Sequence, residues 1–427
     1  MGIAGVGRLT ALWGLVGPGG PPTTSHHEPL RISAEAKMNS RSSSSENTRR
    51  AARGAFDASD VEPAESFLPA PTVQCHAANL VLLPDGSLGC SWFGGTQEGL
   101  SDIAVWFSVL SADGTWATPV KVSDDATRSE QNPVPFLAGP HELRIYFTAQ
   151  NAGDQDTAEV RLASSGDGGR SWEPGQTAVP AKAGTGVYIR QPPLVLEDGR
   201  LLLPAFYCPR PENGRWVGDA DYSGVLVSSD NGSTWTAHQV PESTGCVHMN
   251  VLRLHDGSFL ALFRRRQADF IHRSHSTDGV TWSAPVPTDL PNNNSSVQAV
   301  VLHDGRVVVA YNHSSAADAA ERRSSLYDEI DGSSTDTPTP PGPAFWGAPR
   351  APLTLAVSSD GGLTWPVSRN VEEGDGYCLT NNSREGHNRE LSYPSLVQTA
   401  DGLLHLAYTH FRRAIKYVQL HPSWLDG

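Results

Sequence analysis

The sequence predicts an all-β protein, a six-bladed β-propeller with four-stranded antiparallel blades. Two observations carry this prediction. A β-hairpin signature recurs six times along the 427-residue chain, and a turn motif rich in Ser, Asp, Gly and Trp recurs five times between the hairpins. Because the two signatures alternate in order, they indicate a repeated structural unit rather than a set of unrelated turns.

The first repeat consists of an apolar run, a turn that contains Asp-Gly, and a second apolar run. An Asp-Gly pair tolerates the positive φ of a tight hairpin turn. Complete copies turn at Asp85, Asp198, Asp256, Asp304 and Asp401, and a degenerate sixth copy turns at Gly139-Pro140. Outside one long gap, the turns stand about 50 residues apart, which leaves room for four strands in each unit.

The second repeat is Ser-x-Asp-x-Gly-x-Thr-Trp. Its Ser and Asp side chains can bond the backbone N–H groups of the turn, its Gly takes the left-handed conformation, and its Trp is expected to bury its ring between neighbouring sheets. Good copies end at Trp172, Trp235 and Trp365, a copy shortened by one residue ends at Trp282, and a weaker copy ends at Trp116. A single copy is a polar turn, whereas five in alternation with hairpins indicate a propeller.

Two segments lack the strand pattern. Residues 1–66 are rich in Ser, Arg, Gly and Pro, and we expect them to be disordered or a targeting segment. The propeller is expected over residues 67–427. Within it, residues 316–349 form a low-complexity stretch that ends in Thr-Pro-Thr-Pro-Pro-Gly-Pro followed by a short tail, and we interpret it as a loop insertion.

Composition narrows the class of partner and of compartment. The net charge of −14, without an extended basic run, argues against nucleic acid as a partner. No stretch approaches the roughly 20 apolar residues of a membrane span. Residues 9–16 form a weak apolar patch after Arg8, so the localisation stays open between secretion, an organelle and the cytoplasm.

The five cysteines are expected to be small core residues. A two-residue turn at Asp85-Gly86 would place Cys90 opposite Val81, so Cys75, its nearest neighbour in sequence, is a poor disulfide partner. The chain contains no CxxC pair, His/Cys cluster or nucleotide-binding glycine motif. We therefore expect neither a metal nor an organic cofactor.

A functional site is expected where the innermost strands of all blades converge, at one mouth of the central channel. At the start of the first strand of each hairpin, the sequence places His76, Gln131 or Asn132, Arg190, His248 or Asn250, Asn294 and Tyr393, and Arg264 ends a returning strand. Strand ends are often polar because they are solvated, which accounts for the asparagines. It accounts less well for the histidines, the arginines and the tyrosine, which suit a pocket of carbohydrate size.

Residues 68–420 resemble the sialidase (neuraminidase) superfamily, in which the Ser/Asp/Gly/Trp turn is called an Asp box. The more specific stretches are 76–106, which contains Trp92-Phe93-Gly94-Gly95-Thr96-x-Glu98-Gly99, and Glu390-x-Ser392-Tyr393-Pro394. Both stretches are similar to a microbial branch of sialidase-like proteins with BNR repeats. The resemblance implies an exo-α-sialidase-like glycoside hydrolase that releases a terminal acidic sugar from a glycan.

The resemblance also implies roles for three residues. Tyr393 matches the nucleophile, because a carboxylate in its place would be repelled by the carboxylate of the substrate. Asp102 matches the acid/base residue on a loop of the first blade. Arg264 matches one of three arginines that bind the substrate carboxylate with forked hydrogen bonds.

Three positions depart from the superfamily pattern. His76 stands where the first arginine is expected, and Thr409 stands where a glutamate would orient that arginine. The glutamate that activates the tyrosine would fall near Met249, where the chain has no carboxylate. Either another base takes this part, or the chemistry differs from that of a sialidase.

Several residues are candidates to fill these gaps. Glu390 or His248 could serve as the base for Tyr393, and Arg190, Arg412 and Arg389 could rebuild the anion clamp. Glu98 is either a solvated loop carboxylate or a second carboxylate that raises the pKa of Asp102 and keeps it protonated.

Three classes of function therefore remain open. The first is an exo-sialidase-like hydrolase acting on an anionic glycan. The second is a hydrolase or lyase of another acidic glycan, with His76 or His248 as base. The third is a propeller that binds a glycan without turnover, with Asn294 and the other ring residues as contacts.

Overall fold

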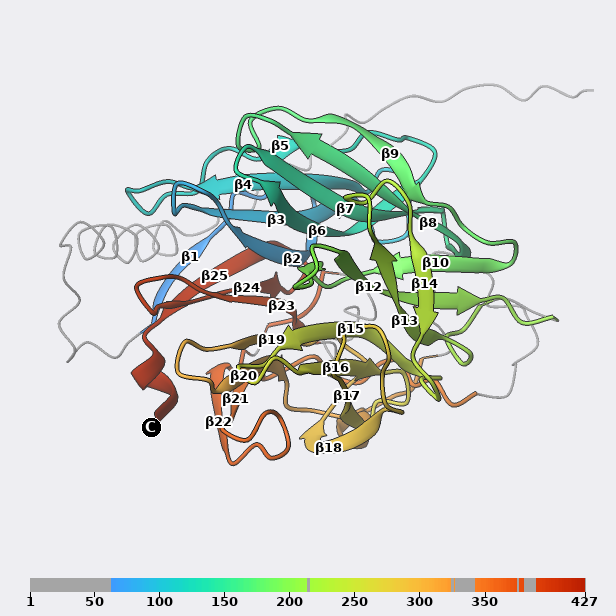
Figure 1. The fold of residues 1–427 in the computed structure, drawn as a ribbon, viewed down its shortest axis with the longest axis vertical. Helices are drawn as coiled ribbons and strands as arrows, with labels where there is room; N and C mark the ends of the chain where they lie inside the picture. The colour runs from blue at the N-terminus through green and yellow to red at the C-terminus, as the bar shows by residue number, and fades with distance from the viewer. Residues whose placement is uncertain are drawn as a thin grey trace, which may run out of the picture. The chain divides into compact units, whose positions relative to one another are not determined.

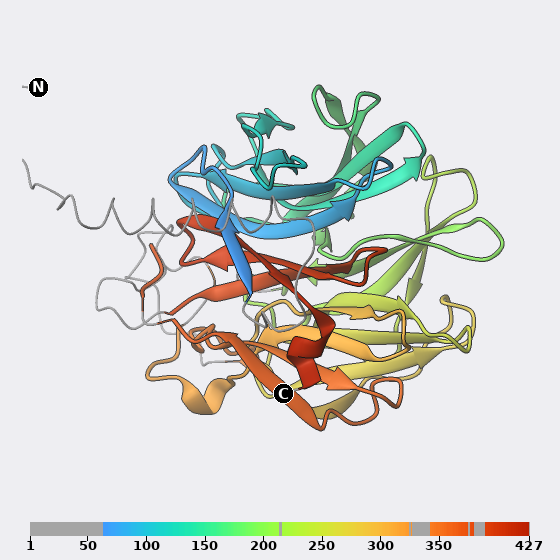
Figure 2. The same ribbon diagram turned by 90° about the vertical axis from the view of Figure 1, so that its left-hand side faces the viewer.

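The computed structural model describes residues 63–212, 216–323, 326, 342–374, 376–379 and 389–426, all within one unit, Asn47–Gly427. These residues form six antiparallel sheets, arranged as the blades of a propeller (Figures 1 and 2). The prediction of an all-β, six-bladed propeller is thereby confirmed. Most of the predicted disordered or targeting segment, up to residue 62, lies outside the described residues.

Each of the first three blades is a sheet ordered from the central channel outwards. The first contains β2 (Gln74–Leu82), β3 (Leu88–Gly95), β4 (Ala104–Leu110) and β5 (Val120–Lys121). The second contains β6 (Ser129–Gly139), β7 (Glu142–Asn151), β8 (Asp154–Ser165) and β9 (Glu173–Val179). The third contains β10 (Thr185–Ile189) and β11 (Leu194–Val195), which both pair with β12 (Leu201–Pro209), then β13 (Tyr222–Ser228) and β14 (Thr236–Gln239). The break between β10 and β11 falls at Arg190.

The last three blades follow the same plan. The fourth contains β15 (Cys246–Arg253), β16 (Phe259–Arg265), β17 (Phe270–Ser276) and β18 (Val286–Pro291). The fifth contains β19 (Gln298–Val301), β20 (Val307–Asn312), β21 (Leu353–Ser358) and β22 (Val367–Glu372). The sixth contains β23 (Leu391–Gln398), β24 (Leu404–His410), β25 (Ala414–Leu420) and β1 (Ala64–Phe67). Two 3₁₀ helices are η1 (Ala316–Asp318) and η3 (Pro422–Asp426), and no helix in the described ranges is long and apolar enough to cross a membrane.

The sixth blade is closed by the first strand of the chain. β1 pairs antiparallel with β25, from Ala64 opposite Gln419 to Phe67 opposite Lys416, so the blue and red ends of the ribbon lie side by side in Figure 1. Leu68 follows β1 and is 3% exposed in the core. The propeller thus begins at Ala64 rather than at the predicted Phe67, because a polar four-residue edge strand carries too weak a hydrophobic pattern to be recognised.

The hairpin turns are longer by one residue than the sequence suggested. In the first blade Leu80 lies opposite Cys90 and Leu82 opposite Leu88, so the predicted pairing of Cys90 with Val81 is wrong. The turn joins Leu83 to Ser87, and Gly86 has φ +83. A three-residue loop with a left-handed Gly is a common hairpin turn, and it shifts the register by one. All five cysteines of the chain are buried, as expected of small core residues.

The Asp-box tryptophans lie between neighbouring blades. Trp116 packs edge-on against Tyr417 of the sixth blade, and Trp172 packs edge-on against Phe107 of the first. Trp282 and Trp365 are each 5% exposed within clusters that span two blades. The turns themselves are held as expected, since in the third blade Asp230 accepts hydrogen bonds from the N–H and hydroxyl of Thr234.

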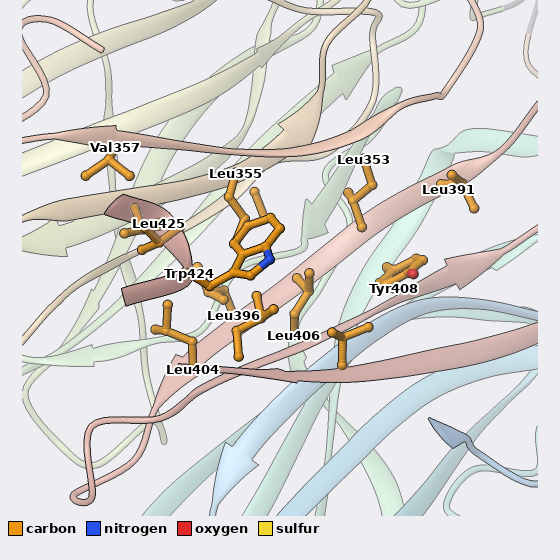
Figure 3. Close-up of a cluster of buried hydrophobic side chains, with 14 of the residues drawn as sticks. Leu353, Leu355, Val357, Leu391, Leu396, Leu404, Leu406, Tyr408, Trp424 and Leu425 are labelled. Atoms are coloured by element: carbon orange, nitrogen blue, oxygen red, sulfur yellow. The ribbon is translucent and has the colours of Figure 1, made fainter. Parts of the chain in front are cut away.

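Apolar layers between the blades form the core. One layer joins blades five and six, and Figure 3 shows the indole of Trp424 among Leu355, Leu396 and Leu406. This layer buries aliphatic side chains from facing sheets, which is the main source of stability in a sheet-on-sheet fold.

Side-chain amides join the inner strands across the channel. Asn79 of β2 donates to the carbonyl of Pro133 (2.9 Å), and Gln298 of β19 donates to both Asn79 (3.0 Å) and Gln191 (2.9 Å). These groups are buried, and each bond satisfies a polar atom that would otherwise be costly to bury. A buried network of side-chain amides therefore links the inner parts of blades one, two, three and five.

Candidate active site

The inner strands bend at equivalent points, where one residue has a left-handed backbone. Such residues are Ala77 (φ 61), Asn132 (φ 51), His248 (φ 54), Asn294 (φ 56) and Tyr393 (φ 52). In β2, β6, β15 and β23 the pairing register shifts at this point, which defines a β-bulge. A bulge re-aims a side chain, so in blades one, two, four and six the repeat itself redirects one residue of the inner strand.

Tyr393 lies at the centre of the resulting cluster. Its ring is 4.3 Å from the His76 ring and 5.5 Å from the His248 ring, measured between centroids. The Arg190 guanidinium lies 5.3 Å from the ring centroid. The side chain is 6% exposed, and its hydroxyl accepts a hydrogen bond of 2.7 Å from Nη1 of Arg264. Residues from four blades thus meet at one phenol.

Arg264 is fixed at the end of β16 by a second contact. Its Nε donates to Oδ1 of Asn294 (2.7 Å), while Nδ2 of Asn294 donates to the carbonyl of Phe345 (2.8 Å). Nη2 of Arg264 is buried, and no residue in the described ranges forms a hydrogen bond with it. Burial lowers the pKa of Arg264 to about 9, which still leaves it charged at neutral pH.

Glu390 holds two other arginines beside this pair. It accepts hydrogen bonds from Nη1 of Arg350 (2.8 Å), from Nε of Arg412 (3.0 Å) and from the hydroxyl of Ser392 (2.7 Å). Burial acts to raise the pKa of Glu390, but Arg412 and Arg350 outweigh it and hold the pKa well below its usual range. Such a carboxylate is a poor proton acceptor, so the geometry assigns Glu390 the task of positioning Arg350 and Arg412.

Arg412 bridges the sixth blade to the loop after β3. Besides Glu390, its Nη1 contacts the carboxylate of Glu98. Burial opposes its charge, but the two carboxylates raise the pKa of Arg412 well above its ordinary value. Arg412 is therefore ion-paired with both Glu390 and Glu98, and its place in an anion clamp stays a prediction.

Arg190 lies on the channel side of Tyr393. Its Nη2 donates to the backbone carbonyls of Ala78 (3.0 Å), Tyr393 (3.1 Å) and Pro394 (3.4 Å), which ties together the bulges of the first and sixth blades. Its Nε and Nη1 are buried and have no hydrogen-bond partner among the residues that the structure describes. Burial lowers the pKa of Arg190 to about 10, so this residue also stays charged at neutral pH.

The cluster carries an excess of positive charge. Five buried arginines stand against three buried carboxylates that pair with them: Arg190, Arg264, Arg266, Arg350 and Arg412 against Glu98, Asp221 and Glu390. In the described part of the chain, Arg190 and Arg264 contact no carboxylate. A buried charge without a counter-charge is costly, so these two arginines carry the least compensated charges of the five.

Both histidines beside Tyr393 are neutral. Burial, reinforced by the neighbouring arginines, lowers the pKa of His76 and of His248 well below the usual value, although Glu390 partly opposes the shift at His76. Nη1 of Arg264 lies 3.4 Å from Nε2 of His248. Since a guanidinium only donates, Nε2 of His248 is the unprotonated nitrogen by this assignment.

Asp102 and Glu98 occupy the same loop but have different partners. The Asp102 side chain is exposed, and its Oδ2 accepts a hydrogen bond from the N–H of Thr96 (2.8 Å). Glu98 is 9% exposed and pairs with Arg412. The two carboxylates therefore have separate hydrogen-bond and ion-pair partners.

The predicted insertion supplies part of the site wall. Arg350, directly after it, pairs with Glu390, and Trp346 is 3% exposed with the Arg266 guanidinium 5.1 Å from its ring. The chain is tied down here by hydrogen bonds from Ala344 N–H to Asp219 (2.8 Å) and from Trp346 to the carbonyl of Val217 (3.0 Å). Residues 342–349 are thus packed against blades three and four rather than forming a separate loop.

Sequence reasoning missed Arg350, Arg266, Asp221 and Trp346. Arg266 and Asp221 form a buried salt bridge of 2.7 Å at the edge of the site. A run of Pro and Gly hid Arg350, although an arginine three residues before the strand at Leu353–Ser358 was a usable signal. Conversely, Arg389 donates to the carbonyl of Gly374 (2.8 Å) and does not join the cluster.

No group of His, Cys, Asp and Glu in the described ranges has the geometry of a metal site. Two open cavities, of about 590 and 760 Å³, lie around the Asp85 turn at the other end of the first blade. Neither is lined by a residue of the Tyr393 cluster. The cluster is therefore defined by its side-chain chemistry rather than by either of these two cavities.

The fold is similar to that of solved sialidases. The Hadza microbial sialidase Hz136 shares 15% identity at a TM-score of 0.61, over 83% of this chain and 67% of that chain. The NanB sialidase from Streptococcus pneumoniae shares 13% at 0.59, over 84% and 70%. The intramolecular trans-sialidase from Ruminococcus gnavus, in complex with oseltamivir carboxylate, shares 14% at 0.59, over 87% and 100%.

At these identities the likeness shows the fold alone. A search of curated proteins finds no match. The BNR repeat-like domain family matches residues 86–406, which is most of the chain. This protein therefore belongs to the BNR repeat-like domain family.

Proposed function

We propose that this protein is an exo-acting glycoside hydrolase that releases a terminal acidic sugar, a sialic acid or a related sugar, from a glycan. The hydrogen bond between Arg264 and the Tyr393 hydroxyl carries the proposal. It places a potential nucleophile against a cation that has spare donors, within a cluster that has more positive than negative charge. The similarity to sialidases in fold supports the same reading.

In this proposal the substrate carboxylate binds Arg264 and Arg350. Nη2 of Arg264 has no partner, and Arg350 is oriented by Glu390 while its guanidinium lies 5.5 Å from the Tyr393 ring. Forked hydrogen bonds from guanidinium groups suit a planar carboxylate. Asn294 and Glu390 act behind these two arginines and position them.

The reaction then proceeds in two steps. The Tyr393 oxygen forms a bond to the anomeric carbon while the bond to the leaving oxygen breaks, and Asp102 gives that oxygen a proton. His248 takes the phenolic proton, since its unprotonated Nε2 lies beside the same Arg264 nitrogen. Water, deprotonated by Asp102, displaces tyrosine, which recovers its proton from His248. Two displacements retain the configuration at the anomeric carbon.

The test is a release assay with fluorogenic sialosides, uronides and deoxyhexosides, comparing the unaltered chain with Tyr393→Phe. Release from the sialosides alone, lost in the variant and with retention seen by NMR of the first-formed sugar, supports the proposal. Release that persists in Tyr393→Phe, or no release from any acidic glycoside, contradicts it.

A second candidate, elimination from a uronic-acid glycan, is favoured by a specific observation. Among the described residues no carboxylate contacts the Tyr393 hydroxyl, whereas two neutral imidazoles lie against its ring. A lyase would use such groups to move a proton from the carbon next to the carboxylate. Its product has a carbon–carbon double bond conjugated with the carboxylate, so new ultraviolet absorbance from a polyuronide distinguishes it from hydrolysis.

A further inference from the structure

The hydroxyl of Thr409 connects the last blade to the first through two hydrogen bonds. It lies 2.8 Å from Nδ1 of His76, and it accepts a hydrogen bond of 3.1 Å from the backbone N–H of Ala77. His76, Ala77 and Thr409 are all at most 1% exposed. In the described part of the chain, the Thr409 hydroxyl has no other hydrogen-bond partner.

The Ala77 contact decides the direction of the His76 contact. A backbone N–H only donates, so Thr409 must accept there, and its own hydrogen needs an acceptor. Nδ1 of His76 provides one if that nitrogen is unprotonated. The opposite assignment would leave two groups unsatisfied, the Thr409 hydrogen and the Nε2 lone pair, whereas this one leaves a single N–H at Nε2.

The charges around the ring agree with a neutral imidazole. Arg412, Arg350 and Arg190 oppose its protonation, and Glu390, whose Oε1 lies 3.8 Å from Nδ1, is already bonded to Arg350 and Ser392. A hydrogen on Nδ1 would have to point at Thr409 and away from this carboxylate. The Nε2 atom is buried, and no described residue accepts its hydrogen.

We propose that Thr409 fixes His76 as the neutral Nε2–H tautomer, so that His76 is a hydrogen-bond donor to an uncharged oxygen of the bound sugar. The role as donor to sugar rests on the proposed function. This tautomer excludes His76 as the base of the reaction. His76 then donates through its Nε2, whereas His248 accepts through its Nε2. The two imidazoles on either side of Tyr393 thus hold opposite tautomers.

The tautomer is tested by NMR on the full, ¹⁵N-labelled chain. Long-range ¹H–¹⁵N correlations distinguish protonated from unprotonated ring nitrogens, and the His76 signals are identified by their loss in His76→Gln. We expect an unprotonated Nδ1 and a protonated Nε2 from pH 8 to pH 6. A protonated Nδ1 at pH 8 overturns the inference whether or not the protein has any activity.

Two variants of Thr409 test whether its hydroxyl sets the tautomer of His76. Thr409→Ser keeps the hydroxyl and should keep the Nε2–H pattern. Thr409→Val removes the hydroxyl and should produce a measurable fraction of the Nδ1–H form. An unchanged pattern in Thr409→Val overturns the role of Thr409 as the group that fixes the tautomer.

The donor role is tested by kinetics on the sialoside that is released fastest. His76→Gln keeps an N–H near Nε2 and should stay within about threefold of the unaltered kcat/KM, whereas His76→Phe should raise KM by about tenfold or more with a smaller change in kcat. Equal losses in both variants overturn the donor role. Absence of release from every glycoside, with the Nε2–H pattern present, contradicts the proposed function and the donor role but leaves the tautomer established.

Discussion

Nη1 of Arg264, at the end of the fourth blade's second strand, lies 2.7 Å from the hydroxyl of Tyr393, on the first strand of the sixth blade. Because the guanidinium cannot accept a hydrogen bond, the phenolic proton must point elsewhere. Negative charge that develops on the phenol oxygen therefore faces a fixed cation. The propeller brings these two residues together although 129 positions separate them in the chain.

The first prediction concerns the Tyr393 hydroxyl. Tyr393→Phe should lower kcat by at least about a thousandfold, because it removes the nucleophile. The ring contacts with His76 and Arg190 do not need the hydroxyl, so the melting temperature should change little. Tyr207→Phe is the matched control, since the Tyr207 hydroxyl is buried and bonds to no residue in the described part of the chain. Similar activity in both variants would remove Tyr393 from the reaction.

The second prediction concerns the shape of the Arg264 side chain. Arg264→Lys should lower kcat/KM for acidic glycosides by about 100-fold, because one ammonium cannot contact both Tyr393 and Asn294 and still bind a carboxylate with two hydrogens. Arg389→Lys, outside the cluster, should leave kcat/KM unchanged. If the lysine variant also kept full activity, the forked contact with the substrate would be wrong.

The third prediction concerns the pH dependence of stability. Burial lowers the pKa of His405 to about 4, whereas an unfolded histidine titrates near 6.5. Below pH 6.5 the unfolded chain binds a proton that the folded chain does not, so the unfolding free energy falls by about 1.4 kcal/mol per pH unit down to about pH 4.

Replacing His405 tests this slope. His405→Gln should reduce the dependence of unfolding free energy on pH between 6.5 and 4 by about one proton, as measured by urea unfolding at several pH values. His421 lies on the exposed surface, and His421→Gln is the control. An equal slope in the unaltered chain and in His405→Gln would mean that His405 is charged in the fold.

The fourth prediction concerns the closing strand. A chain that begins at Pro63 should be as stable as the full chain, whereas one that begins at Pro71 loses β1 and the buried Leu68. Loss of one buried leucine alone costs about 2–5 kcal/mol, and the ion pair of 3.0 Å between Lys416 and Glu65 is lost as well. The test compares the urea concentrations at which the two truncated chains are half unfolded. Equal midpoints would show that β1 does not stabilise the sixth blade.

The fifth prediction concerns the Asp-box tryptophans. Trp282→Ala should cost about 3–5 kcal/mol of unfolding free energy, because the ring is 5% exposed and packs with Leu196 and Phe259. Trp235 is only half-buried, against Tyr146, so Trp235→Ala should cost less. Thermal or urea unfolding measures both losses. A larger loss of unfolding free energy in Trp235→Ala than in Trp282→Ala would contradict the role of the more buried ring in packing two blades together.

Local chemistry was enough to predict the repeats. An Asp-Gly turn places its Gly in the left-handed conformation, as at Gly86. The Ser, Asp and Trp of each Asp box act within one turn or against one neighbouring sheet. Because these interactions are short in sequence, the number of blades, their four-stranded plan and the convergence of Tyr393, His76, His248 and Arg264 could be expected from the sequence.

Only the tertiary structure decided what each charged group does. Glu390 stands three residues before Tyr393 and was a candidate base, yet Arg350 and Arg412, distant in sequence, hold it as an anchor. Likewise the tautomer of His76 depends on Thr409, which lies 333 positions away. Burial and the summed field of neighbouring arginines set protonation, and both exist only when six blades close around the channel.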